Sequence, residues 1–139
     1  MRGYNKRWAA LFGLLLPGWI SCSRVDPGSV QPESAAPYRR IDAAEARRRM
    51  VEPGAILLDV RTSGEHQALR IPGSKLIPHT EIRERAPLEI PDHEALILVY
   101  CRSGARSARA VRQLLELGYR NVLDFGGIQS WDGEVLRGP

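Results

Sequence analysis

The feature that most constrains this chain is an aliphatic run that leads directly into a loop containing a cysteine. Residues 95–100, Ala-Leu-Ile-Leu-Val-Tyr, are typical of a strand that is buried on both faces. The loop Cys101–Ser107 follows, and apolar residues then recur at helical spacing up to Leu117. Gly118 stands where a helix commonly ends. The stretch therefore predicts a buried strand, a short loop and a helix from Ser107 to Leu117.

The residues of this loop indicate an activated cysteine. A loop between a buried strand and a helix directs backbone N–H groups and the positive end of the helix dipole into one small concavity. Arg102 and Arg106 add two full positive charges. Because these groups favour the anion of Cys101 over its thiol, we predict a nucleophilic thiolate in an anion-binding loop. The alternative is a buried cysteine that acts as a small apolar side chain.

Residues 1–21 have the layout of a secretory signal peptide. A short apolar stretch, Trp8 to Leu16, is preceded by the basic residues Arg2, Lys6 and Arg7. Cys22 then resembles the lipidated first residue of mature bacterial lipoproteins. By this resemblance the protein is exported and anchored, through a lipid on Cys22 alone, to the periplasmic side of the outer membrane. Ordinary cleavage, an uncleaved anchor and a cytosolic protein with an apolar N-terminus are the alternatives.

The composition of the next segment and the charge of the chain limit the remaining possibilities. Residues 22–37 are rich in Pro, Ser and Gly and predict a flexible tether, whereas residues 38–139 have the size of one domain. The net charge of +4 falls to +1 without the three basic residues of the signal segment, because 17 basic residues then face 16 acidic ones. The charge therefore gives no argument for a nucleic-acid partner.

Strands and helices alternate along residues 38–139. Strands are predicted at 38–41, 55–60, 74–77, 95–100 and 121–125, helices at 42–51, 63–69, 80–86 and 107–117, a loop at 87–94, and a terminal helix that includes Trp131. This alternation predicts an α/β fold, in which a parallel sheet of about five strands has helices on both faces. Ligands bind beyond the carboxyl ends of such strands, so we expect Cys101 and Arg61 to share one end of the sheet.

Four motifs in this domain resemble those of single-domain rhodanese-like sulfurtransferases. They are Leu58-Asp59-Val60-Arg61 followed by Glu65, Ile71-Pro72-Gly73-Ser74 with Ile77-Pro78, the loop Cys101–Ser107, and Gly126-Gly127-Ile128 before Trp131. The resemblance covers nearly all of residues 38–139 and implies the three-layer rhodanese fold. The chain departs from the family in one place, because Leu69-Arg70-Ile71 stands where Gly-His-Ile is usual. This departure bears on the end of the preceding helix and on the choice of substrate.

The resemblance also implies a sulfur relay through a persulfide on Cys101. The thiolate takes a sulfur from thiosulfate or a similar small anionic donor and passes it to a thiol, to cyanide or to the thiol of a partner protein. The family's substrate-binding loop corresponds to Arg102, Ser103, Gly104, Ala105, Arg106 and Ser107. Arg106 has two open roles, donor binding or bracing of the loop. Asp59 and Arg61 are expected to support the site through an ion pair with neighbours rather than to act in catalysis. No cofactor is implied.

Three alternative functions compete with this interpretation. A rhodanese-like domain with little turnover would be a sulfur carrier or a regulatory binding module. A phosphatase or arsenate reductase usually has five residues between its cysteine and arginine, whereas four separate Cys101 from Arg106. A Cys-His hydrolase needs a histidine beside Cys101, but His66, His79 and His93 are predicted to lie on the surface. Two distant cysteines and scattered histidines form no pattern of metal ligands.

Overall fold

Five strands form a parallel sheet in residues 38–139, the part of the chain that the computed structural model describes. In the order in which they lie side by side, they are β1 (Arg39–Arg40), β6 (Val122–Gly127), β5 (Ile97–Cys101), β2 (Ile56–Asp59) and β4 (Lys75–Leu76). Every neighbouring pair is parallel. The predicted α/β fold with a parallel sheet of about five strands is confirmed.

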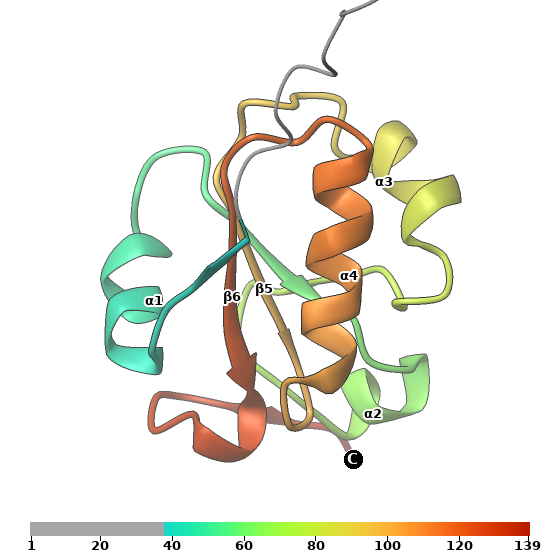
Figure 1. Cartoon of the computed structure of the whole chain (residues 1–139). Coiled ribbons are helices and arrows are strands. Elements are labelled where there is room, and N and C mark those ends of the chain that lie inside the picture. Colours follow the sequence, from blue (N-terminus) through green and yellow to red (C-terminus); the bar gives the residue numbers. More distant parts are fainter. Residues whose placement is uncertain (1–37) are drawn as a thin grey trace, which may run out of the picture. The chain divides into compact units, whose positions relative to one another are not determined.

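Helices cover both faces of this sheet (Figure 1). Helix α1 (Ala43–Arg49) packs on one face, and α3 (Ile82–Glu89) and α4 (Ala105–Glu116) pack on the other. The short helix α2 (Ser63–Ala68) and the 3₁₀ turn η1 (Ile128–Ser130) lie near the carboxyl ends of the strands. A separate antiparallel pair joins β3 (Leu69–Arg70) to β7 (Leu136–Arg137).

The central strand β5 divides the core into two layers. All five of its residues are buried, and its side chains alternate between the two faces of the sheet. Ile97, Val99 and Cys101 belong to the apolar cluster under α3 and α4, whereas Leu98 and Tyr100 belong to the cluster under α1. The alternation therefore puts the sulfur of Cys101 on the same side of the sheet as α4.

The structure corrects the predicted loop at residues 87–94. Helix α3 continues through Pro87 to Glu89, although proline removes one helical hydrogen bond. Buried side chains at Ile82 and Ala86 hold the helix on the sheet. Arg85 adds ion pairs with residues four positions away on both sides, to Glu81 and Glu89 at 2.7 Å each. Packing and these pairs outweigh the local effect of the proline.

Two other predictions at the carboxyl end of the sheet need correction. Helix α4 begins at Ala105 rather than at Ser107, because Gly104 already occupies the N-cap position. The terminal helix is only the turn η1, and Trp131 follows it with its ring packed on Phe125 at a centroid distance of 5.6 Å. The pairing of β3 with β7 was not predicted, since strands of two residues show no periodicity.

The predicted signal peptide (residues 1–21), tether (residues 22–37) and lipidation site (Cys22) lie outside the described residues. They stay predictions from the sequence. Among the helices of residues 38–139, none has the length and apolar character needed to cross a bilayer.

Gly127 packs directly against the cysteine loop, and this contact generates a stability prediction. A Cβ atom at this position would lie 2.3 Å from the carbonyl oxygen of Arg102. We expect Gly127→Ala to lower the free energy of unfolding by about 1–3 kcal/mol, measured by urea denaturation. Gly64→Ala is the matched control, since open space surrounds that position in α2, and it should be neutral or stabilising by up to about 1 kcal/mol. Equal stabilities of the two variants would contradict the close approach.

Candidate active site

Cys101 is enclosed by the loop that connects β5 to α4. It is the last residue of β5 and is only 1% exposed. Gly104 adopts a left-handed conformation with φ of 108°, which residues with a side chain rarely adopt. This conformation turns the loop back so that the Gly104 N–H donates a hydrogen bond to Sγ of Cys101 at 3.1 Å. The predicted arrangement, a cysteine within a loop of backbone amides, is present in the structure.

The loop lowers the pKa of the Cys101 thiol below its ordinary value. Burial is the largest single influence and acts in the opposite direction, because it disfavours a charged sulfur. The backbone N–H groups of Ser107, Gly104 and Ser103, together with the Ser107 hydroxyl, stabilise the thiolate and outweigh burial. The lowered pKa thus comes chiefly from peptide groups and not from the arginines.

Ser107 links the loop to the neighbouring strand. Its buried hydroxyl donates to the carbonyl oxygen of Gly104 at 2.9 Å and lies 3.3 Å from that of Gly126. The hydroxyl carries one hydrogen, so the two carbonyl oxygens and the sulfur of Cys101 compete for it. A thiolate forms the stronger hydrogen bond because it is a charged acceptor. Ionisation of Cys101 therefore draws the hydrogen bond towards the sulfur.

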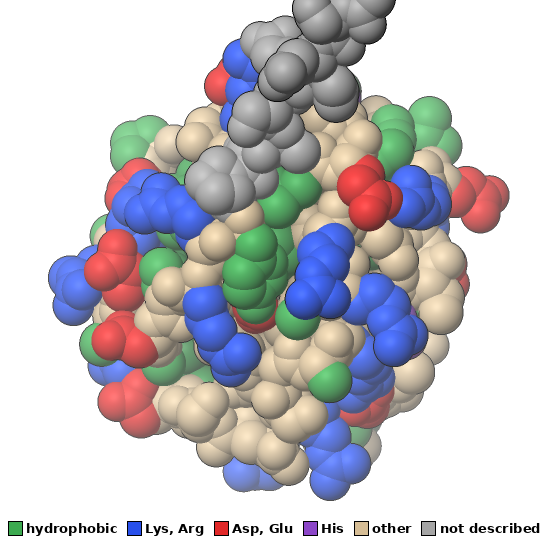
Figure 2. Space-filling model, viewed as in Figure 1, with side chains coloured by type: hydrophobic (Ala, Val, Ile, Leu, Met, Phe, Trp, Pro, Cys, Tyr) green, Lys and Arg blue, Asp and Glu red, His purple; other side chains and the backbone are tan. Residues whose placement is uncertain are grey.

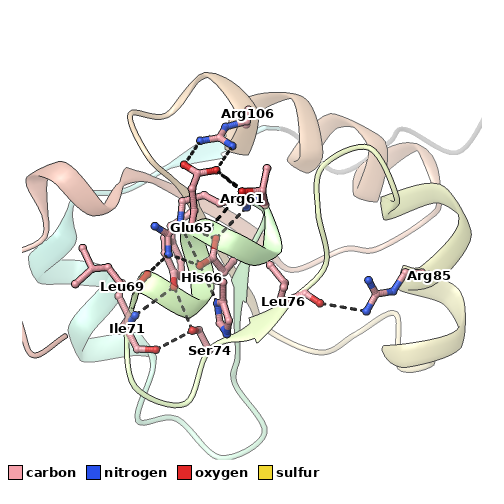
Figure 3. Close-up of polar contacts among 12 residues, drawn as sticks. Arg61, Glu65, His66, Leu69, Ile71, Ser74, Leu76, Arg85 and Arg106 are labelled. Atoms are coloured by element: carbon pink, nitrogen blue, oxygen red, sulfur yellow. Dashed lines mark hydrogen bonds and ion pairs between the residues drawn. The ribbon is translucent and has the colours of Figure 1, made fainter. Parts of the chain in front are cut away.

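Arg106 braces the loop against α2 (Figure 3). Its guanidinium forms two hydrogen bonds with the carboxylate of Glu65, at 2.6 and 2.8 Å. The Arg106 hydrogen bonds are the main reason why the pKa of Glu65 is lowered to about 2, and Thr62 adds to the effect against the influence of burial. The sequence left two roles open for Arg106, donor binding and bracing of the loop. The contact with Glu65 corresponds to bracing. Arg102, by contrast, is exposed and has no ion-pair partner within residues 38–139.

A buried network holds α2 on the end of β2. Asp59 and Arg61 pair with each other, with Nη2 of Arg61 2.6 Å from Oδ2 of Asp59. The same guanidinium donates to the carbonyl oxygen of Leu69 at 2.6 Å, and His66 Nδ1 lies 3.0 Å from Oδ2 of Asp59 (Figure 3). Among residues 38–139, the hydrogen bonds of this network reach α2 and β3 and none reaches the sulfur, so the network positions the elements around the loop.

Tyr100 connects the cysteine strand to the Pro-Gly turn. Its hydroxyl donates to Oγ of Ser74 at 3.1 Å and accepts from the N–H of Ile71 at 3.3 Å. Burial raises the pKa of Tyr100 to about 12, so the phenol stays protonated and can donate. The guanidinium of Arg61 lies over its ring, 5.5 Å from the centroid. These contacts fix the side chain of Tyr100, the residue that precedes Cys101.

The three histidines of the domain differ in burial and in the residues they contact. The prediction of a surface position is wrong for His66, whose side chain is 16% exposed and bonded to Asp59. His79 is half-buried, and His93 is exposed and stacked on Tyr119 at 4.4 Å. All three lie in the described part of the chain, and none forms a hydrogen bond with Cys101. The hydrogen bonds of these residues thus give no support to a Cys-His hydrolase. Within residues 38–139, no cluster of three metal-ligating side chains occurs.

Arg40 is a residue of the site that sequence analysis missed. Its Nη2 lies 3.2 Å from the position that a Cβ atom would take at Gly104, and 3.0 Å from that position at Gly126. The guanidinium therefore packs over the backbone of the cysteine loop from β1. Figure 2 shows that Lys and Arg side chains gather on the face where β1 and α4 lie, and Arg109 and Arg112 of α4 are also exposed. The surroundings of the loop thus favour anions.

Comparison with known proteins agrees with this geometry. The chain matches the family model of the rhodanese-like domain over residues 42–134. It is 35% identical over 72 residues to thiosulfate sulfurtransferase PspE of Escherichia coli K12, which covers 52% of this chain and 69% of the relative. It is 38% identical over 93 residues to a sulfurtransferase of Allochromatium vinosum, covering 66% and 85%. The crystal structure of a rhodanese-related protein from Thermoplasma volcanium is 35% identical, with a TM-score of 0.62 over 71% of this chain and 98% of that one.

Several other relatives are much longer proteins. The chain spans 28% or less of the adenylyltransferase and sulfurtransferase proteins of yeasts and maize that it matches. The similarity to them concerns one domain only.

The Ser107 hydroxyl generates a prediction for the reactivity of Cys101. The rate of alkylation by iodoacetamide follows the thiolate fraction, so its pH profile reports the pKa of Cys101. We expect Ser107→Ala to shift the midpoint of this profile to higher pH, because one donor to the thiolate is lost. Ser103→Ala is the matched control, since only the backbone of Ser103 contributes. The assignment fails if both variants keep the wild-type midpoint.

The Glu65–Arg106 pair generates a prediction for stability against pH. The pKa of Glu65 falls from 4.5 to about 2 on folding, so the pair contributes fully above pH 4.5 and is lost as the pH falls through 2. The difference in free energy of unfolding between wild type and Glu65→Gln should therefore be largest at neutral pH and shrink across this window. Urea denaturation at several pH values measures it. Glu84→Gln removes an exposed carboxylate of α3, and the same pH dependence in both variants would contradict the assignment.

Proposed function

This chain belongs to the rhodanese-like domain family, and on that premise we propose that it transfers sulfane sulfur through a persulfide on Cys101. The observation that carries the proposal is the hydrogen bond from the Gly104 N–H to the buried sulfur, within a loop that lowers the pKa of the thiol. A thiolate is the nucleophile that such a reaction needs, and a lowered pKa increases the fraction of Cys101 in that form. Relatives that are named sulfurtransferases support sulfur transfer as the reaction class.

The first step loads the cysteine. The Cys101 thiolate attacks the outer sulfur of thiosulfate, a new S–S bond forms, and the donor's own S–S bond breaks. The electron pair of the broken bond leaves with sulfite. Three negative charges enter this step and three leave it, as a persulfide anion and a sulfite dianion, so no proton transfer is required. This explains why the site functions without a histidine.

The loop supports the loaded state by the same contacts that support the thiolate. A persulfide extends the negative charge one atom further from Cys101, towards the amides at the start of α4. Backbone N–H groups that are already fixed in place stabilise such a charge without reorganisation, as an oxyanion hole does. Arg102 and Arg40 supply positive charge for the incoming anion, whereas Arg106 is held by Glu65.

The second step returns the cysteine to its thiolate. A thiol or cyanide attacks the outer sulfur of the persulfide, and the Cys101 thiolate is the leaving group. The low pKa of this thiol makes it a good leaving group. A carrier or regulatory module would be loaded in the same way but would release its sulfur to small acceptors only slowly.

Intact mass spectrometry tests the proposal directly. After incubation with thiosulfate, the protein should gain one sulfur atom, and cyanide should remove it with formation of thiocyanate. Cys101→Ser should gain none, and Ser103→Ala serves as a control variant of the same loop. The proposal fails if wild type gains no sulfur or if Cys101→Ser still accepts it. Loading without release to cyanide or small thiols would favour the carrier function.

A further inference from the structure

Asp124 is a buried acidic residue that the proposed reaction does not use. It lies in β6, which runs between β1 and β5 (Figure 1), and its side chain is fully buried. Its neighbours along the strand, Leu123 and Phe125, belong to the apolar cluster under α1. The alternation of side chains along a strand therefore directs Asp124 to the opposite face of the sheet, which α4 covers. Cys101 lies on that same face.

Two hydrogen-bond donors satisfy the carboxylate of Asp124. The N–H of Gly126 donates to Oδ1 at 2.8 Å, and the hydroxyl of Tyr38 donates to Oδ2. Burial raises the pKa of Tyr38 and Asp124 adds to this effect, so the phenol is protonated and can donate. These are the only hydrogen bonds of the Asp124 side chain among residues 38–139, and neither comes from a cation. A carboxylate buried without an ion pair is costly, so we looked for a role for its contacts.

The bond from Gly126 to Asp124 fixes a tight turn at the end of β6. Gly126 has a φ of 86°, in the left-handed region, and a carboxylate that accepts from the N–H two residues later stabilises such a turn. The turn brings Gly127 against the cysteine loop. A Cβ atom at Gly127 would lie 2.3 Å from the carbonyl oxygen of Arg102 and 2.7 Å from Cα of Ser103.

This turn confines the part of the loop that supplies amides to the sulfur. Besides the contact of Gly127 with Ser103, Cα of Gly126 lies 3.5 Å from the position that a Cβ atom would take at Gly104. The N–H groups of Ser103 and Gly104 both favour the thiolate of Cys101 over its thiol, against the effect of burial. If the turn relaxed, these two amides would be free to move away from the sulfur.

We propose that Asp124 is a positioning residue for sulfur transfer, because its carboxylate fixes the Gly126–Gly127 turn against the loop that surrounds the sulfur. This inference rests on the proposed transfer through Cys101 and adds a residue that acts on it through the backbone. Both residues lie in the described part of the chain, and they form no hydrogen bond with each other. The oxygen that accepts from Gly126 is the feature that matters, and the charge of the carboxylate is not.

The pH profile of Cys101 alkylation by iodoacetamide separates the oxygen of Asp124 from its charge. Asp124→Leu has a similar shape without an acceptor, and we expect it to raise the midpoint by about half a pH unit, as the loss of a hydrogen bond would. Asp124→Asn keeps an acceptor oxygen without the charge and should restore the midpoint to near that of wild type. A lower midpoint in Asp124→Asn would overturn the proposal, because the charge would then act directly on the sulfur. A wild-type midpoint in Asp124→Leu would also overturn it.

Asp92→Leu is the matched control for this experiment. Oδ1 of Asp92 accepts from the N–H of Glu94, two residues later, at 2.9 Å, but in an exposed turn. This variant should keep the wild-type midpoint, and a shift equal to that of Asp124→Leu would contradict the proposal. Urea denaturation shows whether each variant is folded. If Asp124→Leu is not, Asp124→Ala takes its place, and the direction of any shift in Asp124→Asn still decides between oxygen and charge.

Sulfur loading distinguishes failure of this inference from failure of the proposed function. With thiosulfate at a pH below the midpoint, Asp124→Leu should load Cys101 about threefold more slowly than wild type, since its thiolate fraction is lower. If the alkylation profiles behave as expected but wild type gains no sulfur, the proposed function fails and Asp124 still positions the thiolate loop. If wild type gains sulfur and Asp124→Leu matches it in both measurements, the inference fails and the function stands.

Discussion

Cys101 lies in a site that is almost closed to water, so a negative charge on its sulfur must be compensated by the protein. Burying a charge costs several kcal/mol unless nearby groups compensate for it. At Cys101 the compensation comes mainly from backbone N–H groups, which the left-handed turn at Gly104 aims at the sulfur. These dipoles are fixed before any charge appears. The ion pairs around the loop act on its position, because Arg106 is held by Glu65 and not by the sulfur.

Much of the fold follows from local patterns in the sequence. The aliphatic run at residues 95–100 predicts the central strand, and its alternation with helices predicts a parallel sheet whose carboxyl ends carry the site. The errors lie where packing overrides a local signal or where the signal is too short. Pro87 stays within α3 because Ile82 and Ala86 anchor that helix. The strand β3 pairs with β7 over only two residues in each, which is below the length at which periodicity can be detected.

The contacts of the site also fall into two groups, those that the sequence predicts and those that it does not. The sequence indicates contacts between close neighbours, as in the cysteine loop, where Gly104 lies three positions after Cys101 and bonds to its sulfur. Contacts between distant segments were not. Glu65 and Arg106 are separated by 41 positions, and Arg40 approaches the loop from a strand at the edge of the sheet. No property of these residues alone indicates which partner they meet.

If Cys101 takes up sulfur as proposed, the amides of the loop should hold the added atom. A crystal structure of the thiosulfate-treated protein tests this claim most directly, because it shows where the added atom lies. The account predicts an extra sulfur bonded to Sγ of Cys101, within hydrogen-bond distance of the backbone N–H groups between Ser103 and Ser107. An added sulfur that points away from these amides, or that is bonded elsewhere, would contradict the account.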